Sequence, residues 1–347
     1  MKNIIVTGGS GFIGSNFILN HIMFKESKIL NLDKLTYAAN NENLIQIAES
    51  PNYNFVKGDI GDRKLVESIF REFVPDIIVN FAAESHVDRS IDSPDNFMKT
   101  NILGTLNLLN ISLDYFNSKK PIKFIHVSTD EVFGSLKINE NPFTEDSQYR
   151  PSSPYSASKA SSDHLVKSWH TTYNLPTIIT NCSNNYGPYQ FPEKLIPLII
   201  ANCIDEKPLP VYGDGSNIRD WIYVNDHCKA INLIIEGGRV GENYNIGGHN
   251  EVKNIDIVNT ICLLLDDLQP RINGSYKNLI TFVKDRPGHD FRYGIDSSRL
   301  QQDLGWKPEE SFDSGLKKTV KWYLENESWW RNIQNTRYHQ ERLGLTK

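Results

Sequence analysis

Two side chains in the middle of the sequence could together take a proton from a hydroxyl group. Tyr155 and Lys159 follow Pro154, which favours the first turn of a helix, so we expect them on one helical face. A neighbouring ammonium favours the phenolate form of tyrosine, which can then act as a base. Tyr-x-x-x-Lys pairs without a catalytic role are also common in helices, so this interpretation depends on the surroundings of the pair.

Two adjacent acidic residues could supply an acid and a base in one place. Asp130 and Glu131 follow Ser128 and Thr129 after the apolar residues 124–127. The carboxyl ends of parallel strands form the edge of a sheet where ligands bind. Neighbouring acids in a confined site push their pKa values apart, which suits the elimination of water. The alternative is structural, because Ser-Thr-Asp-Glu is also a good sequence for capping a helix.

A glycine-rich segment near the N-terminus has the spacing of a dinucleotide site. Gly9, Gly11 and Gly14 satisfy G-x-G-x-x-G, and Gly8 extends the motif between a predicted strand and a predicted helix. Such glycines permit a tight turn, a close approach of backbone N–H groups to a pyrophosphate, and close packing of helix on strand. An ordinary glycine-rich turn is the alternative.

Two aspartates at the ends of the next predicted strands support that site. Asp33 lies 19 residues after Gly14, where a carboxylate can accept from both ribose hydroxyls and would repel a 2′-phosphate. This favours NAD over NADP. Asp59 and Ile60 could flank the adenine ring. A strand-end cap for Asp33 and a solvated turn for Asp59 remain the structural alternatives.

The elements that must position these residues alternate along the first half of the chain. Apolar runs predict strands at 3–7, 28–33, 53–57, 76–82, 122–128 and 177–181, and longer segments predict helices at 12–24, 63–73, 96–116 and 153–173. This order predicts an α/β fold with a Rossmann-type doubly wound parallel sheet. From about residue 185, glycines and prolines interrupt the pattern, which indicates a smaller C-terminal substrate-binding lobe.

We expect the two parts of the chain to interleave. A further strand at 243–246 and helices at 254–265 and 312–326 follow the interruption. We therefore expect residues 1–185 to form an NAD-binding domain to which segments at about 220–250 return. Residues 186–330 then form most of the second lobe, and 331–347 a polar tail.

Composition narrows the class of protein. The chain has 347 residues and a net charge of -5, which argues against a nucleic-acid-binding protein. Its 4 cysteines include no C-x-x-C pair, so we expect neither a metal site nor a disulfide framework. We expect a cytoplasmic enzyme, because the sequence shows no signal peptide and no apolar run that could span a membrane.

At this point the chain resembles the dTDP-glucose 4,6-dehydratases, a family of extended short-chain dehydrogenases/reductases, over nearly its whole length. The resemblance rests on residues 8–16, 33–38, 81–90, 100–101, 128–132, 153–160, 181–189, 191–195, 212–215, 219–221 and 286–290. It implies a hydro-lyase of nucleotide-sugar metabolism, for example in rhamnose biosynthesis, with tightly held NAD. In the implied cycle, a hydride leaves sugar C4, water is lost across C5 and C6, and the hydride returns to C6.

The resemblance also implies a role for each matching residue. Tyr155 would remove the O4 proton with the support of Lys159, and Thr129 would hold the C4 oxygen. Asp130 would protonate the departing C6 hydroxyl, and Glu131 would take the C5 proton. The implied NAD site consists of Gly8, Gly11, Phe12, Ile13, Gly14, Asp33, Lys34, Leu35, Thr36, Asp59, Ile60, Phe81, Ala82, Ala83, Ser85, Thr100, Tyr155, Lys159 and Asn185.

The implied substrate site draws mainly on the second lobe. Arg219 and Arg286 are the main candidates for the diphosphate, because a guanidinium can bind phosphate oxygens through two N–H groups. The whole set is Ser85, Thr129, Asn184, Lys194, Leu195, Pro210, Val211, Tyr212, Arg219, Asn254, Asp285, Arg286, His289 and Tyr293.

Several alternatives remain open from the sequence. Phe133, Arg150 and Phe291 depart from the family pattern, and Phe291 leaves the base of the nucleotide open between dTDP and UDP. A UDP-sugar 4-epimerase would share the NAD site but would not need Asp130 and Glu131, and a non-catalytic NAD-binding protein would need neither. We expect a homodimer in which helices 96–116 and 153–173 pair across a twofold axis, although their apolar faces could also pack within one subunit.

Overall fold

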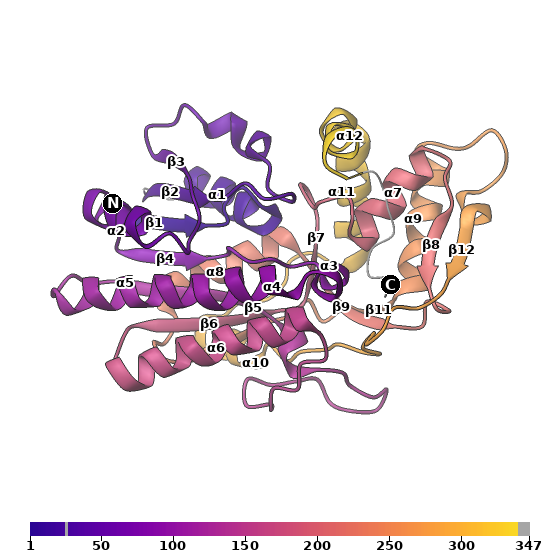
Figure 1. Cartoon of the computed structure of the whole chain (residues 1–347). Coiled ribbons are helices and arrows are strands. Elements are labelled where there is room, and N and C mark those ends of the chain that lie inside the picture. The colour runs from indigo at the N-terminus through magenta and orange to yellow at the C-terminus, as the bar shows by residue number, and fades with distance from the viewer. Residues whose placement is uncertain (25–26, 339–347) are drawn as a thin grey trace.

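The structure, a computed structural model that describes residues 1–24 and 27–338, is built around a parallel sheet of seven strands (Figure 1). The strand order is β10-β6-β5-β4-β1-β2-β3. The order reverses between β1 and β4, which is where a doubly wound sheet binds its ligand. The predicted Rossmann-type sheet is therefore confirmed. The strands are β1 (Lys2–Thr7), β2 (Ser27–Asp33), β3 (Tyr53–Lys57), β4 (Ile77–Asn80), β5 (Lys123–Thr129), β6 (Thr177–Cys182) and β10 (Asn243–Ile246).

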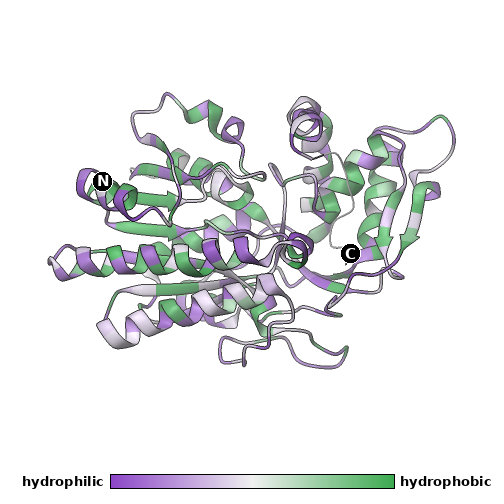
Figure 2. Ribbon diagram, in the orientation of Figure 1, coloured by the Kyte–Doolittle hydropathy of each residue, from purple (hydrophilic) through white to green (hydrophobic). Residues whose placement is uncertain are grey.

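Alternate residues of the strands pack into two separate apolar layers. In β1, Ile4 and Val6 face a layer shared with α1 (Phe12–Phe24) and α8 (Val224–Gly237). Ile5 faces the opposite layer, which α2 (Arg63–Phe73), α5 (Thr105–Asn117) and α6 (Pro154–Tyr173) cover. Because successive strand residues point to opposite faces, near-continuous apolar strands are what a sheet covered on both sides requires. Figure 2 shows these strands as the hydrophobic centre of the larger part of the molecule.

The predicted helix at 96–116 lies within a continuous helical segment, but this segment is not α-helical throughout. The segment contains α4 (Pro94–Phe97), a π-helical turn at Met98–Gly104 and then α5. The turn carries Asn101, whose side chain accepts from the Glu84 N–H and donates to the Glu84 carbonyl and to Ser158. The wider turn therefore serves tertiary hydrogen bonds that helical periodicity does not reveal.

The smaller lobe contains two short sheets and a separate core. The sheets are ordered β11-β9-β7 and β12-β8. Tyr186, Ile199, Leu316, Tyr323 and Trp330 are among the buried residues of its core. The strands are β7 (Asn184–Tyr186), β8 (Leu209–Tyr212), β9 (Ile218–Tyr223), β11 (Glu251–Lys253) and β12 (Ile280–Val283), and the helices are α7 (Leu195–Ile204), α9 (Asn254–Leu268), α11 (Phe312–Glu325) and α12 (Glu327–Thr336). Between them, α8, β10 and α10 (Ser298–Leu304) return to the large sheet.

The predicted polar tail at 331–347 is wrong for its first part. Residues as far as Thr336 complete α12, and Ile333 is buried against Phe191 and Tyr338. An apolar residue once per turn in a polar sequence is enough to dock a helix, which composition alone did not show. Residues 339–347 lie outside the described part of the chain. Among the described residues, no helix has the length and apolar character needed to cross a membrane.

Candidate active site

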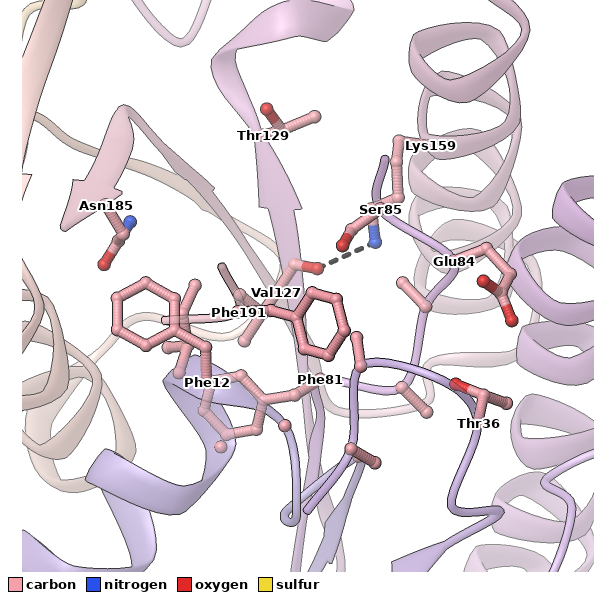
Figure 3. Close-up of a pocket in the computed structure, with 18 of the residues that line it drawn as sticks. Phe12, Thr36, Phe81, Glu84, Ser85, Val127, Thr129, Lys159, Asn185 and Phe191 are labelled. Atoms are coloured by element: carbon pink, nitrogen blue, oxygen red, sulfur yellow. Dashed lines mark hydrogen bonds between the residues drawn. The ribbon is translucent and has the colours of Figure 1, made fainter. Parts of the chain in front are cut away.

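A cleft of about 370 Å³ opens at the carboxyl edge of the large sheet. It gathers all five predicted catalytic residues and, apart from Leu35, every residue of the predicted NAD site. Ser85, Thr129, Asn184, Lys194 and Leu195 of the predicted substrate site also line it. Figure 3 shows Ser85 and Thr129 among the lining residues. Asp130 and Glu131 thus line the same cleft as Tyr155.

The glycine turn leaves room at one end of this cleft for a dinucleotide. Gly8 has φ 69°, and a Cβ placed there would lie 2.7 Å from the backbone N of Ala82. The chain then enters α1, whose first N–H groups favour an anion. Glycine at this position therefore lets two strand ends approach each other closely, and the geometry fits a bound pyrophosphate.

Asp33 is fixed at the end of β2 by backbone donors. Its Oδ2 accepts from the Ser10 N–H (2.9 Å) and its Oδ1 from the Leu35 N–H (2.8 Å). Burial raises the pKa of Asp33, and these two hydrogen bonds oppose that rise. Leu35 thus acts through its backbone, and the remaining lone pairs of the Asp33 carboxylate can accept from ribose hydroxyls. At the end of β3, Asp59 pairs with Lys34 (2.7 Å).

The start of α6 fixes Tyr155 and Lys159 against β5. Ser153 caps the helix through a reciprocal pair with Ser156, and Pro154 occupies its first turn. Lys159 Nζ donates to the carbonyl of Val127 (2.8 Å), and Figure 3 shows this side chain reaching from α6 to β5. Burial and the Glu131 carboxylate raise the pKa of Tyr155 well above 10, whereas its hydrogen bond with Thr129 lowers it. Burial also lowers the pKa of Lys159.

Buried polar groups lie behind Lys159. His126 Nε2 is 3.5 Å from Lys159 Nζ and 3.4 Å from Asp163 Oδ1. Burial, with the charge of Lys159, lowers the pKa of His126 to about 4, so this ring is neutral near pH 7. Asp163 also accepts from Ser128 (2.8 Å) and Tyr149 (3.0 Å). The lysine charge therefore has a buried acidic neighbour, which raises its pKa against the effect of burial.

Asp130 and Glu131 lie in the first turn of a short 3-10 helix, Asp130–Phe133, which Thr129 caps. Ser-Thr-Asp-Glu therefore caps a short helix, and this capping role is compatible with an acid–base role for Asp130 and Glu131. Burial, Glu131 and Asp220 raise the pKa of Asp130 well above its usual value, and its Oδ2 is buried without a hydrogen bond among the described residues. Burial also raises the pKa of Glu131, but three cations, Arg286, Arg219 and Lys194, oppose the rise. Burial and acidic neighbours thus raise the pKa of Asp130 strongly, whereas the three cations limit the rise at Glu131, so Glu131 is the easier of the two to ionise.

The remaining predicted substrate residues lie outside the lining of the cleft. They are Pro210, Val211, Tyr212, Arg219, Asn254, Asp285, Arg286, His289 and Tyr293. Most of the polar ones form hydrogen bonds or ion pairs, and the charges of Arg219 and Arg286 act on Glu131. Arg286 donates to Asp88 Oδ1 (2.8 Å), Tyr212 donates to Asp88 Oδ2 (3.2 Å), and His289 Nδ1 pairs with Asp285 (2.6 Å).

Two of these residues, Arg219 and Val211, are already occupied by contacts within the protein. The Arg219 guanidinium lies over the Tyr293 ring (4.2 Å) and donates to the carbonyls of Ile218, Asp290 and Phe291. Val211 is buried in the core of the small lobe. Arg219 is therefore fixed by its own backbone neighbours, and Arg286, which keeps a buried Nε without a partner among the described residues, has more capacity left for an anion.

Sequence reasoning missed several residues that close the cleft. Gln190, Phe191 and Glu193 line it, and Glu193 accepts from Tyr37 (2.9 Å) and from Arg89 (3.0 Å). The Arg89 guanidinium also covers the Tyr37 ring (3.9 Å). These three segments are far apart in sequence, so no spacing could reveal the cluster, although the Phe-Pro-Glu-Lys-Leu motif pointed to residues 191–195.

Comparisons with known proteins agree with this geometry. The family described as GDP-mannose 4,6 dehydratase matches residues 5–319. A dTDP-glucose 4,6-dehydratase of Neisseria meningitidis is 54% identical over the full length of both chains. The crystal structure of dTDP-glucose 4,6-dehydratase from Bacillus anthracis in complex with NAD matches with a TM-score of 0.86 and 46% identity over 96% of this chain and all of that one. The dTDP-glucose 4,6-dehydratase of Streptomyces venezuelae with NAD and TYD bound has a TM-score of 0.88 and 44% identity over 95% of this chain and 99% of that one.

Proposed function

The chain belongs to the dTDP-glucose 4,6-dehydratases of the extended short-chain dehydrogenase/reductase family, and from this premise we propose that it converts dTDP-glucose to dTDP-4-keto-6-deoxyglucose with loss of water. It is an NAD-dependent hydro-lyase. The observation that carries this conclusion is the shared cleft in which Asp130 and Glu131 lie beside Tyr155 and Lys159.

The cleft has the shape and donors that NAD needs. The Gly8 turn suits the pyrophosphate and Asp33 suits the ribose of the adenosine half. When bound there, NAD would supply the hydride acceptor for oxidation at C4 and the hydride donor for reduction at C6, the latter together with a proton at C5. The crystal structures of the Bacillus anthracis and Streptomyces venezuelae dehydratases contain NAD, in agreement with this assignment.

Tyr155, Lys159 and Thr129 handle the oxygen at C4. Tyr155 takes the proton of the O4 hydroxyl, and the Thr129 hydroxyl, which already bonds Tyr155, holds the C4 oxygen in place. The Lys159 charge, fixed at the Val127 carbonyl, favours the phenolate of Tyr155. The resulting C4 ketone makes the proton at C5 acidic.

Asp130 and Glu131 then eliminate water. Glu131, which the nearby cations make the easier of the two to ionise, removes the C5 proton, and Asp130, whose pKa burial and acidic neighbours raise, donates to the departing C6 hydroxyl. This division of roles follows from the opposite charges around the two carboxyl groups. A 4-epimerase has no step that would use such a pair, which is why the dehydratase is favoured.

The nucleotide part of the substrate is assigned to the second lobe. We assign NAD binding to residues 1–185 with segments of about 220–250, and sugar-nucleotide binding mainly to 186–330. Asn184, Lys194 and Leu195 line the cleft at the junction, and Arg286 is the better placed of the two arginines for the diphosphate. We further propose a cytoplasmic homodimer, paired through α5 and α6, that serves rhamnose biosynthesis.

Turnover of two nucleotide sugars tests the function. We expect the purified enzyme to convert dTDP-glucose to a 4-keto-6-deoxy product without added NADH, detected as a product lighter by one water. UDP-glucose is the matched comparison and should react more slowly. Formation of a C4 epimer without loss of water would instead identify an epimerase, and no product from either substrate would refute the proposal.

A further inference from the structure

The C-terminal helix α12 is bonded to a distant segment that covers the cleft. Trp329 Nε1 donates to Asn43 Oδ1 (2.9 Å), and the Arg337 guanidinium donates to the carbonyl of Ala39. Asn332 adds a longer bond to Glu42 (3.4 Å). Because about 290 residues of chain separate the partners, these bonds join a segment near the N-terminus to one near the C-terminus. In Figure 1, α12 stands above α11 at the top of the small lobe, on the side that faces the large lobe.

The segment that α12 holds is also bonded to the glycine turn. Asn43 Nδ2 donates to the Ser10 carbonyl (3.2 Å), and the Asn40 N–H donates to the same oxygen (2.9 Å). Ser10 Oγ in turn donates to Asn41 Oδ1 (2.8 Å). Ala38 and Ala39 line the cleft itself. Asn43 is thus shared between α12 on one side and the turn that receives the cofactor on the other.

A second contact joins the C-terminal segment to another part of the cleft lining. Tyr338 packs its ring against Phe191 (centroids 6.0 Å apart), and Phe191 lines the cleft. The Tyr37 ring meets Phe191 edge-on (5.5 Å). Ile333 on α12 belongs to the same buried cluster. The C-terminal segment therefore touches both the 37–43 segment and the 189–193 segment.

Trp329 is itself held rigidly. Its ring packs on Tyr189 (5.8 Å) and Trp322 (5.2 Å), and the following Trp330 is buried in the core of the small lobe. A hydrogen bond from a fixed donor loses less side-chain entropy than one from a mobile side chain. The Trp329–Asn43 bond is thus a link between the core of the small lobe and the cofactor turn.

We propose that α12 is a clasp that retains NAD, with Trp329 and Arg337 as positioning residues that act through Asn43 and Ala39 on the wall of the cleft. Both the 37–43 segment and the 189–193 segment contribute residues to the lining of the cleft, and α12 is hydrogen-bonded to the first and packs against the second. The inference rests on the proposed function, since it takes NAD as the molecule in the cleft. According to this inference, contacts of α12 slow the release of NAD in addition to the contacts that the glycine motif makes.

The rate of NAD release tests the clasp. Full-length Trp329→Phe keeps an aromatic ring for Tyr189 and Trp322 but loses the N–H donor. Arg337→Gln replaces the guanidinium that donates to the Ala39 carbonyl by a shorter, uncharged side chain. Purified holoenzymes would be diluted into buffer with a trap for free NAD, and the NAD still bound would be quantified after denaturation. We expect release to be about fivefold faster in each single variant and about twentyfold faster in the double variant. Added NAD should restore turnover.

Arg331→Gln is the matched control on the same helix. Arg331 pairs with Asp205 and Glu327 on the side of the small lobe, and its variant should release NAD at the wild-type rate. Equal release from Trp329→Phe, Arg337→Gln and wild type would overturn the clasp, as would equally fast release from Arg331→Gln. Because release is measured without turnover, an inactive wild type would refute the proposed function and leave the result on the clasp intact.

Discussion

Replacing Glu131 by glutamine should separate the oxidation of the sugar from the loss of water. Only the elimination needs a base at C5, and removing a general base typically slows its step by about 10²- to 10⁴-fold. We therefore expect turnover of dTDP-glucose to fall by about that factor. The fold should persist, because glutamine has nearly the same shape and removes a buried charge.

The first step should not be slowed by this change. The Glu131 carboxylate is the largest electrostatic cause, after burial, of the raised pKa of Tyr155. Neutralising it lowers the pKa of Tyr155, which makes the phenolate more accessible near pH 7. Oxidation at C4 should then proceed at least as fast as in the wild type, and the oxidised sugar should accumulate.

Rapid mixing with substrate distinguishes these steps. The ultraviolet absorbance of reduced nicotinamide should rise in one fast phase and then persist in Glu131→Gln, whereas it should decay in the wild type. In D₂O, deuterium should enter at C5 in the wild type and not in the variant. Glu325→Gln, an exposed change at the end of α11, is the control for the substitution itself. Wild-type turnover in Glu131→Gln, or the absence of the fast phase, would refute this reasoning.

Two further changes test the electrostatics of the site. Thr129→Val removes the hydrogen bond that lowers the pKa of Tyr155. The acid limb of the pH–rate profile should therefore move up by about one to two pH units, and turnover at neutral pH should fall about 10- to 100-fold. An acid limb at the wild-type pH would contradict the role of Thr129. His227 is buried with its pKa lowered to about 3, so the unfolded chain binds its proton first as the pH falls below about 6.5. The wild type should therefore lose about 2 kcal/mol more free energy of unfolding between pH 7 and pH 5 than His227→Gln, measured by urea titration, and parallel losses would refute the assignment.

The sequence predicted the parts of the molecule that depend on local pattern. The strand at 53–57 and the helices at 12–24 and 63–73 have the predicted bounds, because apolar runs and helix-capping residues mark them directly. The catalytic and NAD residues lie together for a related reason. Nearly all of them follow the carboxyl ends of strands of one parallel sheet, and such ends must meet at one edge.

The features that sequence did not predict all depend on contacts between distant segments. The π-helical turn before α5 follows from the bonds of Asn101 to Glu84 and Ser158. Arg219 could be recognised as a cation near the site, but its stacking on Tyr293 depends on how a loop meets strand β9. The docking of α12 depends on Trp329, Trp330 and Ile333, whose partners lie in three other elements.

The late return of β10 to the large sheet constrains how the protein can be made. During synthesis β6 is complete long before Asn243–Ile246 has emerged, so its outer edge stays without a hydrogen-bonding neighbour while the intervening lobe is being translated. Uncovered edges of this kind invite pairing with other chains. A fragment that ends near residue 185 would keep that edge open permanently, so we expect it to aggregate more readily than the whole chain.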